Sequence, residues 1–141
     1  MAAELHTEGV QFLLEVAFTE EQSVPANFYV GLAEDTELAE NAALADITEL
    51  SGNGYARQAV ASSTAGFTSA ATGTNDRKVT TITVLFSASG GAWNKIYTVF
   101  LATTADDSGK LIASAPINSG SGYTLADGEN YEAAMEMVAA A

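Results

Sequence analysis

The sequence predicts a mainly β domain, an antiparallel β-sandwich or barrel-like body with one N-terminal α-helix and a short helical excursion. The run from Ile96 to Leu101 is β-branched, aromatic or aliphatic on both alternating faces, which is typical of a strand buried on both sides. Residues 78–87 alternate between two faces with the period of a strand. Short apolar runs elsewhere are bounded by Gly, Asn and Asp, as expected for strands joined by turns.

Length and composition indicate one folded unit. A chain of 141 residues lies in the usual single-domain range. We expect an N-terminal helical segment over residues 1–24 and a single β domain over residues 25–141. A hydrophobic content of 48% with 16% charged residues excludes a disordered chain. The absence of cysteine excludes disulfides and thiolate metal sites.

The formal net charge of −13 makes nucleic acid an unexpected partner. The five cationic residues are scattered and form no basic stripe that would neutralise phosphates. They are Arg57, Arg77, Lys78, Lys95 and Lys110. No apolar segment approaches the roughly 20 residues of a membrane helix, and no signal-peptide pattern opens the chain, so no membrane partner is expected either.

The first element expected is an amphipathic helix capped by Thr7. It should end before Val24, because Pro25 disfavours helical conformation in the preceding residue. An apolar face this wide must dock, either on the chain's own sheet or on a neighbouring subunit. The residues of that face are Val10, Leu13, Leu14, Ala17 and Phe18, widened by Phe12 and Val16.

Two strands and a long excursion follow. Residues 28–33 predict the first strand, in which Gly31 indicates a bulge or a close backbone approach. Residues 34–50 are acidic and alanine-rich, with room for one or two short helical turns. Residues 55–60 predict the second strand, with Arg57 in its middle. Arg57 pairs with Asp46 or Glu49 in one interpretation, stays exposed in another, and forms a pair across a subunit contact in a third.

The C-terminal half is expected to complete the sheet. We predict irregular chain with an anchored Phe67 over residues 61–73, a turn at 74–76 and one continuous strand over 78–87. Trp93 should close one end of the core. The remaining expectations are a hairpin strand over 110–115 ended by Pro116, a flexible tip at 118–122, and a strand in preference to a helix over 131–139.

The residues carry little visible chemistry. His6 is the single histidine and lies near a terminus, so a catalytic triad or histidine metal site is not expected. Two acidic clusters, residues 106–109 and 127–130, lack the spacing of a calcium hand and are explained as tight turns. We therefore predict no catalytic residues, no cofactor and no metal.

Several segments together resemble a family of small structural proteins of tailed-bacteriophage virions, of the decoration or minor tail type. The similarity runs from Pro25 to the C-terminus. It is carried by turn and core residues, not by a catalytic signature. The segments are Phe28–Leu32, Gly52–Val60 with its Gly-Tyr-Ala-Arg-Gln, Phe67, Phe86, Gly90–Trp93 with its Gly-Gly-Ala-Trp, and Val99–Thr103.

The resemblance implies a non-enzymatic capsid decoration (cement) protein, made in the host cytoplasm and placed on the outer head surface. Its expected partners are further copies of itself, as a trimer, and the major capsid protein or another virion protein. One alternative is a tail fibre, adaptor or tip protein whose Tyr55, Trp93 or Tyr123 contacts a host glycan. A remote alternative is a carboxylate-dependent hydrolase. The candidate assembly residues are Val10, Leu13, Leu14, Phe18, Leu38, Leu44 and Arg57.

Overall fold

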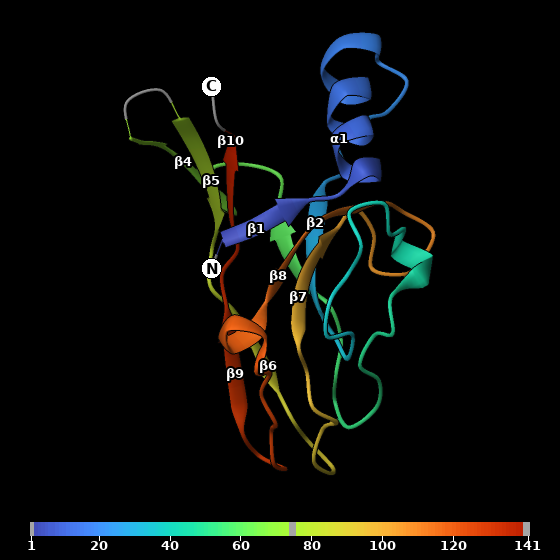
Figure 1. Cartoon of the computed structure of the whole chain (residues 1–141), viewed down its shortest axis with the longest axis vertical. Coiled ribbons are helices and arrows are strands. Elements are labelled where there is room, and N and C mark those ends of the chain that lie inside the picture. Colours follow the sequence, from blue (N-terminus) through green and yellow to red (C-terminus); the bar gives the residue numbers. More distant parts are fainter. Residues whose placement is uncertain (1, 74–75, 140–141) are drawn as a thin grey trace.

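The computed structural model describes residues 2–73 and 76–139 and confirms a mainly β fold with one N-terminal α-helix (Figure 1). The strands are β1 (Ala2–Leu5), β2 (Asn27–Ala33), β3 (Gln58–Ala61), β4 (Phe67–Thr72), β5 (Asp76–Thr81), β6 (Val84–Ser87), β7 (Thr98–Ala102), β8 (Leu111–Pro116), β9 (Asn130–Ala133) and β10 (Glu136–Ala139). The helical elements are α1 (Thr7–Leu14), a π-helical turn η1 (Glu15–Thr19), and the 3₁₀ turns η2 (Leu44–Asp46) and η3 (Ile117–Gly120). Two residues of the turn predicted at 74–76, Thr74 and Asn75, lie outside the described residues.

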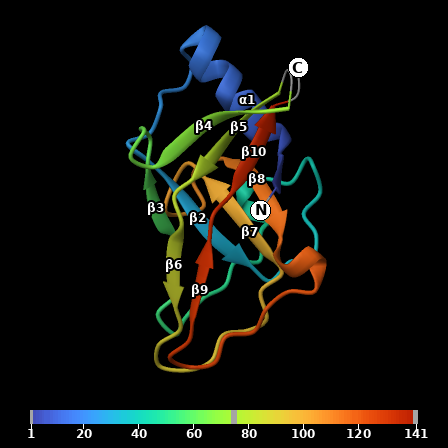
Figure 2. The ribbon, with the colours of Figure 1, turned by 90° about the vertical axis from the view of Figure 1, so that its left-hand side faces the viewer.

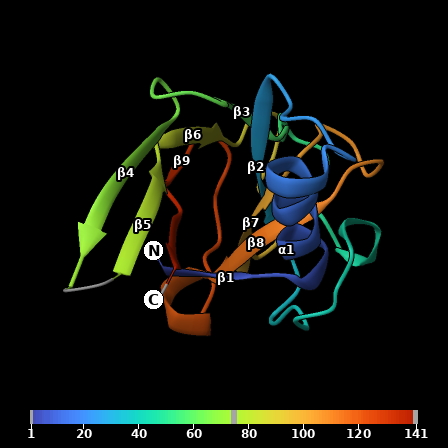
Figure 3. The same cartoon turned by 90° about the horizontal axis from the view of Figure 1, so that it is seen from above.

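Eight strands form one curled sheet in the order β3-β2-β7-β8-β1-β10-β5-β4, and β6 and β9 form a separate ribbon. Every neighbouring pair is antiparallel except β1 and β10, which run parallel. Seen from above, the β4–β5 hairpin lies on the opposite side of the molecule from β2 and β3, and β6 lies between the two groups at the top of the picture (Figure 3). The two-stranded β6–β9 sheet lies below the curled sheet and extends the molecule along its long axis (Figure 2).

Strand β7 is the centre of the sheet, as predicted. All five of its residues are buried, and it pairs with β2 on one side and β8 on the other. Pro116 is the last residue of β8, where its missing N–H leaves the ladder intact. Trp93 is buried in the main core, and its Nε1 donates to the Asn53 carbonyl at 2.9 Å.

The two faces of the central strands bury two separate clusters. The larger fills the inside of the curl and includes Val99 and Leu101. The smaller lies on the opposite face, where Phe100 and Leu111 pack beneath residues 34–50. A register shift between Leu101 and Ala102 turns Leu111 to this second face. The excursion is therefore the lid of a small core and not solvated filler.

The helix docks on its own sheet through Phe12 and Val16, the two residues that widen the predicted face, and not through the centre of that face. Its buried residues are Gly9 and Phe12. Gly9 is needed there, because a Cβ at this position would lie 2.4 Å from the Ile112 carbonyl oxygen of β8. His6, not Thr7, occupies the N-cap position, and no side chain caps the helix. The helical segment ends at Thr19, before Val24 as expected.

Strand β1 was missed by the prediction of a purely helical N-terminal segment. It pairs with β8 on one side and β10 on the other, joining the central strands to the β10-β5-β4 section. Ala2–Leu5 is too short for its period to be recognised in the sequence, and its partners lie more than 100 residues away. The N-terminal segment is thus part of the sheet.

Two predicted long strands are each broken in the middle. Residues 78–87 divide into β5 and β6, and residues 131–139 divide into β9 and β10. The breaks face each other: Thr81 N donates to Met135 O at 2.9 Å, and Met135 N donates to Thr81 Oγ1 at 3.0 Å. At this point both segments of the chain cross between the eight-stranded sheet, which holds β5 and β10, and the two-stranded sheet of β6 and β9. The choice of strand over helix for the last segment is confirmed.

Two boundaries in the middle of the chain also differ from the predictions. Strand β3 begins at Gln58, so Arg57 precedes the strand. Strand β4 occupies residues predicted as irregular, because a Ser, Thr and Ala run has a weak β signal until β5 supplies the pairing. Phe67 is anchored as expected, edge-on to Phe28 with ring centroids 5.6 Å apart.

Candidate assembly surface

The helical segment exposes a continuous apolar face on the outside of the molecule. Val10 and Leu13 are each 40% exposed, Leu14 52% and Phe18 80%. These four residues belong to the face that the sequence predicted as an assembly surface. The side of the helix that docks on the sheet carries Gly9 and Phe12, so Phe12 is the part of the predicted face that is buried, and the four exposed residues remain available for a contact.

An apolar cleft of ≈ 530 Å³ opens beside this face, between the helix and the β10-β5-β4 section. Its lining residues come from both ends and from the middle of the sequence, so no local sequence pattern could predict the cleft. Arg77 of β5 is the charged residue among those that line it. The full lining is Leu5, Leu13, Val24, Phe28, Ser62, Ser63, Thr64, Phe67, Ser69, Arg77, Val79, Leu101, Ile112, Met137, Val138 and Ala139.

A row of aromatic side chains supports the cleft. Phe12 of the helix packs edge-on against Phe28 of β2 at a centroid distance of 6.4 Å, and Phe28 packs in the same way against Phe67 of β4. Such edge-to-face pairs hold rings in defined orientations. The helix, the central strands and the β4–β5 hairpin are thereby tied together beneath the cleft.

The remaining candidate assembly residues lie elsewhere. Leu38 is half-buried against the small core, and Leu44 is 1% exposed within it. Leu44 therefore has no surface to offer a partner, which corrects its inclusion among the candidates. The period of the acidic excursion could not reveal this, because Leu44 is buried by a sheet face that the excursion crosses only in the folded chain.

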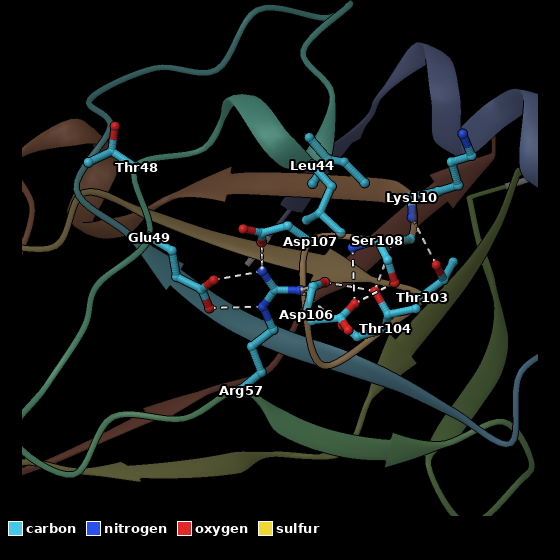
Figure 4. Close-up of polar contacts among 12 residues, drawn as sticks. Leu44, Thr48, Glu49, Arg57, Thr103, Thr104, Asp106, Asp107, Ser108 and Lys110 are labelled. Carbon is cyan, nitrogen blue, oxygen red and sulfur yellow. Dashed lines mark hydrogen bonds and ion pairs between the residues drawn. The ribbon is translucent and has the colours of Figure 1, made fainter.

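Arg57 is held by the chain itself (Figure 4). Its Nε and Nη2 donate to the two carboxylate oxygens of Glu49 at 2.8 Å and 2.6 Å. Nη2 also reaches Asp107 Oδ1 at 2.6 Å, while Nη1 donates to the carbonyls of Thr104 and Asp106. The side chain is 3% exposed. The predicted pairing with Glu49 is confirmed, and it clamps the excursion to the β7–β8 turn.

This cluster shifts the pKa values of its members. Burial would lower the pKa of Arg57, but the hydrogen bond and charge of Glu49, with Asp107, raise it above the ordinary value. Burial, with the hydrogen bond to Glu49, raises the pKa of the Tyr55 hydroxyl well above its ordinary value. That hydroxyl donates to Glu49 Oε1 at 2.6 Å and accepts from the Leu32 N–H at 2.8 Å. Both pKa shifts therefore arise from burial and from the contacts with Glu49 that hold the excursion in place.

His6 is fully buried and fully hydrogen-bonded. Nδ1 lies 3.0 Å from the Ala39 carbonyl and 3.2 Å from that of Glu40, so it carries the proton. Nε2 lies 2.7 Å from Ser114 Oγ. The imidazole therefore joins the excursion to β8, a positioning role that its place near the terminus did not indicate.

The aromatic residues considered for a glycan site serve mostly as packing. Trp93 is buried, and half-buried Tyr55 packs against it edge-on at 5.7 Å while stacking on Phe86 at 6.1 Å. Tyr123 is 38% exposed and leans on Tyr131. The three residues do not form a common sugar platform, which corrects that part of the tail alternative.

The acidic clusters are turns, as predicted. Asp106 accepts from the Ser108 hydroxyl and from the Ser108 N–H, and these hydrogen bonds lower its pKa. Asp127 accepts from the Gly90 N–H at 3.0 Å and so ties two turns together. Within residues 2–73 and 76–139, no three His, Asp or Glu side chains gather as metal ligands. The helices of the same residues include none with the length and apolar character that crossing a bilayer requires.

Comparison with known proteins supplies the family. None of the curated proteins matches this chain. The model of a protein family described as "Podophage GP4 fiber I protein gp80" matches residues 7–135. This match confirms the resemblance to structural proteins of bacteriophage virions. Since it includes 129 of the 141 residues (135 − 7 + 1), the chain belongs to the podophage GP4 fiber I protein gp80 family.

Proposed function

We propose that this protein is a structural component of a bacteriophage tail fibre. The family match carries the proposal: it begins at the first residue of α1 and ends at Met135, so it includes every element except β1 and β10. The matched family is described as a fibre protein, and the match extends over nearly the whole fold. This favours a role in the fibre over a role as a capsid decoration protein. The decoration role differs from it in location and shares its structural, non-enzymatic character.

The geometry supports a role in assembly. The sheet buries a core on both faces, and Arg57, His6 and the aromatic row fix the surface segments to it. Of the nine exposed large hydrophobic residues among those described, four lie on the helical segment, and Val24 and Val138 line the cleft beside it. A well-packed domain with an exposed apolar surface at one end is suited to binding other virion proteins. We propose that its function is to make this protein–protein contact rather than to turn over a substrate.

Labelling of intact virions tests the location. An antibody against this chain, viewed by electron microscopy, should decorate the tail region, and antibody absorbed with the purified protein should not. Label spread over the head would overturn the fibre proposal in favour of decoration. Particles without label would overturn a virion role altogether.

Fractionation provides an independent readout. After heads and tails are separated on a gradient, mass spectrometry should find this chain with the tail proteins. Enrichment with the major capsid protein would support the outer head surface instead.

A further inference from the structure

We propose that Phe18 of one copy inserts into the apolar cleft of a second copy, so that the chain assembles through a knob-and-cleft contact with itself. This goes beyond the proposed fibre role, which does not specify how copies join. The contact is defined by two surfaces that lie beside each other on every chain.

The knob is the π-helical turn that ends the helical segment. Phe18 is 80% exposed, more than any other large hydrophobic side chain among the described residues. Two carboxylates, those of exposed Glu20 and Glu21, follow it after Thr19. Glu20 takes the left-handed conformation at φ 57°, which ends the helical turn just beyond the knob. The chain thus presents an aromatic ring next to negative charge.

The cleft has the complementary properties. Its walls are mainly apolar, with Phe28, Phe67 and Met137 half-buried within it. Its volume of ≈ 530 Å³ falls in the range of sites that enclose organic ligands, so a phenyl ring and its neighbours have room to enter. Exposed Arg77 supplies a positive charge among the lining residues. Its natural occupant is an apolar side chain flanked by carboxylates.

Charge favours a second copy as that occupant. The chain carries a net charge of −13, so two copies repel over most of their surfaces. The Phe18 end can approach this cleft because Glu20 or Glu21 then meets Arg77 in place of another carboxylate. Complementary charges of this kind set the register of an interface and exclude wrong pairings.

The contact is directional. Leu13 lines the cleft whereas Phe18 does not, so one helical segment contributes to the cleft and carries the knob as a separate surface. Each copy can therefore give its knob to one neighbour and receive the knob of another. Such a head-to-tail contact closes into a ring when the rotation between copies allows it.

Sedimentation of the purified full chain is the first experiment. The wild-type protein should form oligomers, and Phe18→Ser should raise the dissociation constant about 30-fold or more, the size of an aromatic hot spot. Ile82→Ser is the matched control, because Ile82 is also exposed but does not line the cleft. A monomeric wild type, or equal dissociation in the two variants, would overturn the proposal.

A charge swap tests the pairing itself. Arg77→Glu and the double variant Glu20→Lys, Glu21→Lys should each dissociate, since each places like charges across the contact. Mixing the two should restore the contact between unlike chains, because each knob then meets a cleft of opposite charge, so complexes that contain both chains should form. Recovery requires both variants to be folded, which their circular dichroism and unfolding midpoints will establish. Folded variants that do not recover on mixing would contradict the assignment of Arg77.

Cross-linking locates the contact by trapping it covalently, which also works on the weaker association expected once the Phe18 ring is removed. The sequence has no cysteine, so Phe18→Cys and Met137→Cys place single thiols on the knob and in the cleft. Oxidation of the mixed variants should join one to the other, whereas Phe18→Cys alone should give few dimers. Preferential Phe18→Cys homodimers would replace the proposed contact with a two-fold one. All three experiments use purified protein, so their failure leaves the virion label in the tail, the test of the fibre role, unaffected.

Discussion

The ring of Phe100 lies so close to Gly31 that a Cβ on Gly31 would be 2.3 Å from the ring's Cζ atom. The two residues are register partners on β7 and β2, and the Arg57 guanidinium lies over the same ring at 5.2 Å. The glycine thus marks a close approach, one of the two alternatives predicted for it. Its place is filled by an aromatic side chain of the neighbouring strand.

Gly31→Ala should therefore destabilise the protein. The added methyl group cannot fit unless Phe100 moves, and overpacking of this kind costs about 1–3 kcal/mol. Urea unfolding measures the change. Phe100→Leu removes the ring atoms that clash, so the double variant should lose less stability than the sum of the single variants. Additive losses would show that the backbone of β2, not the ring, limits the site.

Removal of Glu49 should cost far more than removal of Asp107, although both carboxylates bind the Arg57 guanidinium. The Glu49 side chain is 22% exposed and that of Asp107 is 68% exposed, so water screens the second pair. We expect Glu49→Ala to lower the free energy of unfolding by about 3 kcal/mol, because the buried guanidinium loses its bidentate partner and the Tyr55 hydroxyl its acceptor, and only the exposed Asp107 remains as a carboxylate partner. Asp107→Ala should cost about 1 kcal/mol or less. Similar losses in the two variants would refute the clamp.

The raised pKa of Tyr55 predicts a loss of stability in alkali. Burial and the hydrogen bond to Glu49 favour the neutral hydroxyl in the folded state, whose pKa lies above the unfolded value of 10.0. The folded protein then binds more protons than the unfolded chain, so this stabilisation is complete below pH 10.0 and declines as the pH rises above it. Unfolding midpoints between about pH 8 and pH 11 should fall more steeply for the wild type than for Tyr55→Phe. The same pH dependence of the unfolding midpoint in the two proteins would contradict a raised pKa of Tyr55.

Asp106 predicts the opposite dependence in acid. Hydrogen bonds from Ser108 stabilise its carboxylate in the folded state and lower its pKa below the ordinary 3.8. Its contribution is therefore present above pH 3.8 and is lost as the pH falls through the lower, folded-state value. The difference in stability between wild type and Asp106→Asn should shrink over that range. A difference that stays constant over that range would contradict the stabilisation of the carboxylate by Ser108.

How far the sequence reaches is clearest where strands are concerned. Strand β7, its hairpin partner β8 and the strand β2 are predictable because each carries an unbroken β-forming run with turn residues at its ends. The amphipathic helix and the exposed Val10 to Phe18 face follow from the helical period. The turn role of the acidic clusters follows from Asp and Gly chemistry.

What the tertiary structure decided is which of several apolar faces is buried, and against what. The helix carries apolar residues on most of its circumference, and the fit of Gly9 against Ile112 selects the side that docks. Strand β1 and the breaks at Thr81 and Met135 arise from pairing across the whole chain. The cleft unites residues from Leu5 to Ala139. Local patterns encode periodicity and turns, whereas burial depends on partners that only the folded chain brings together.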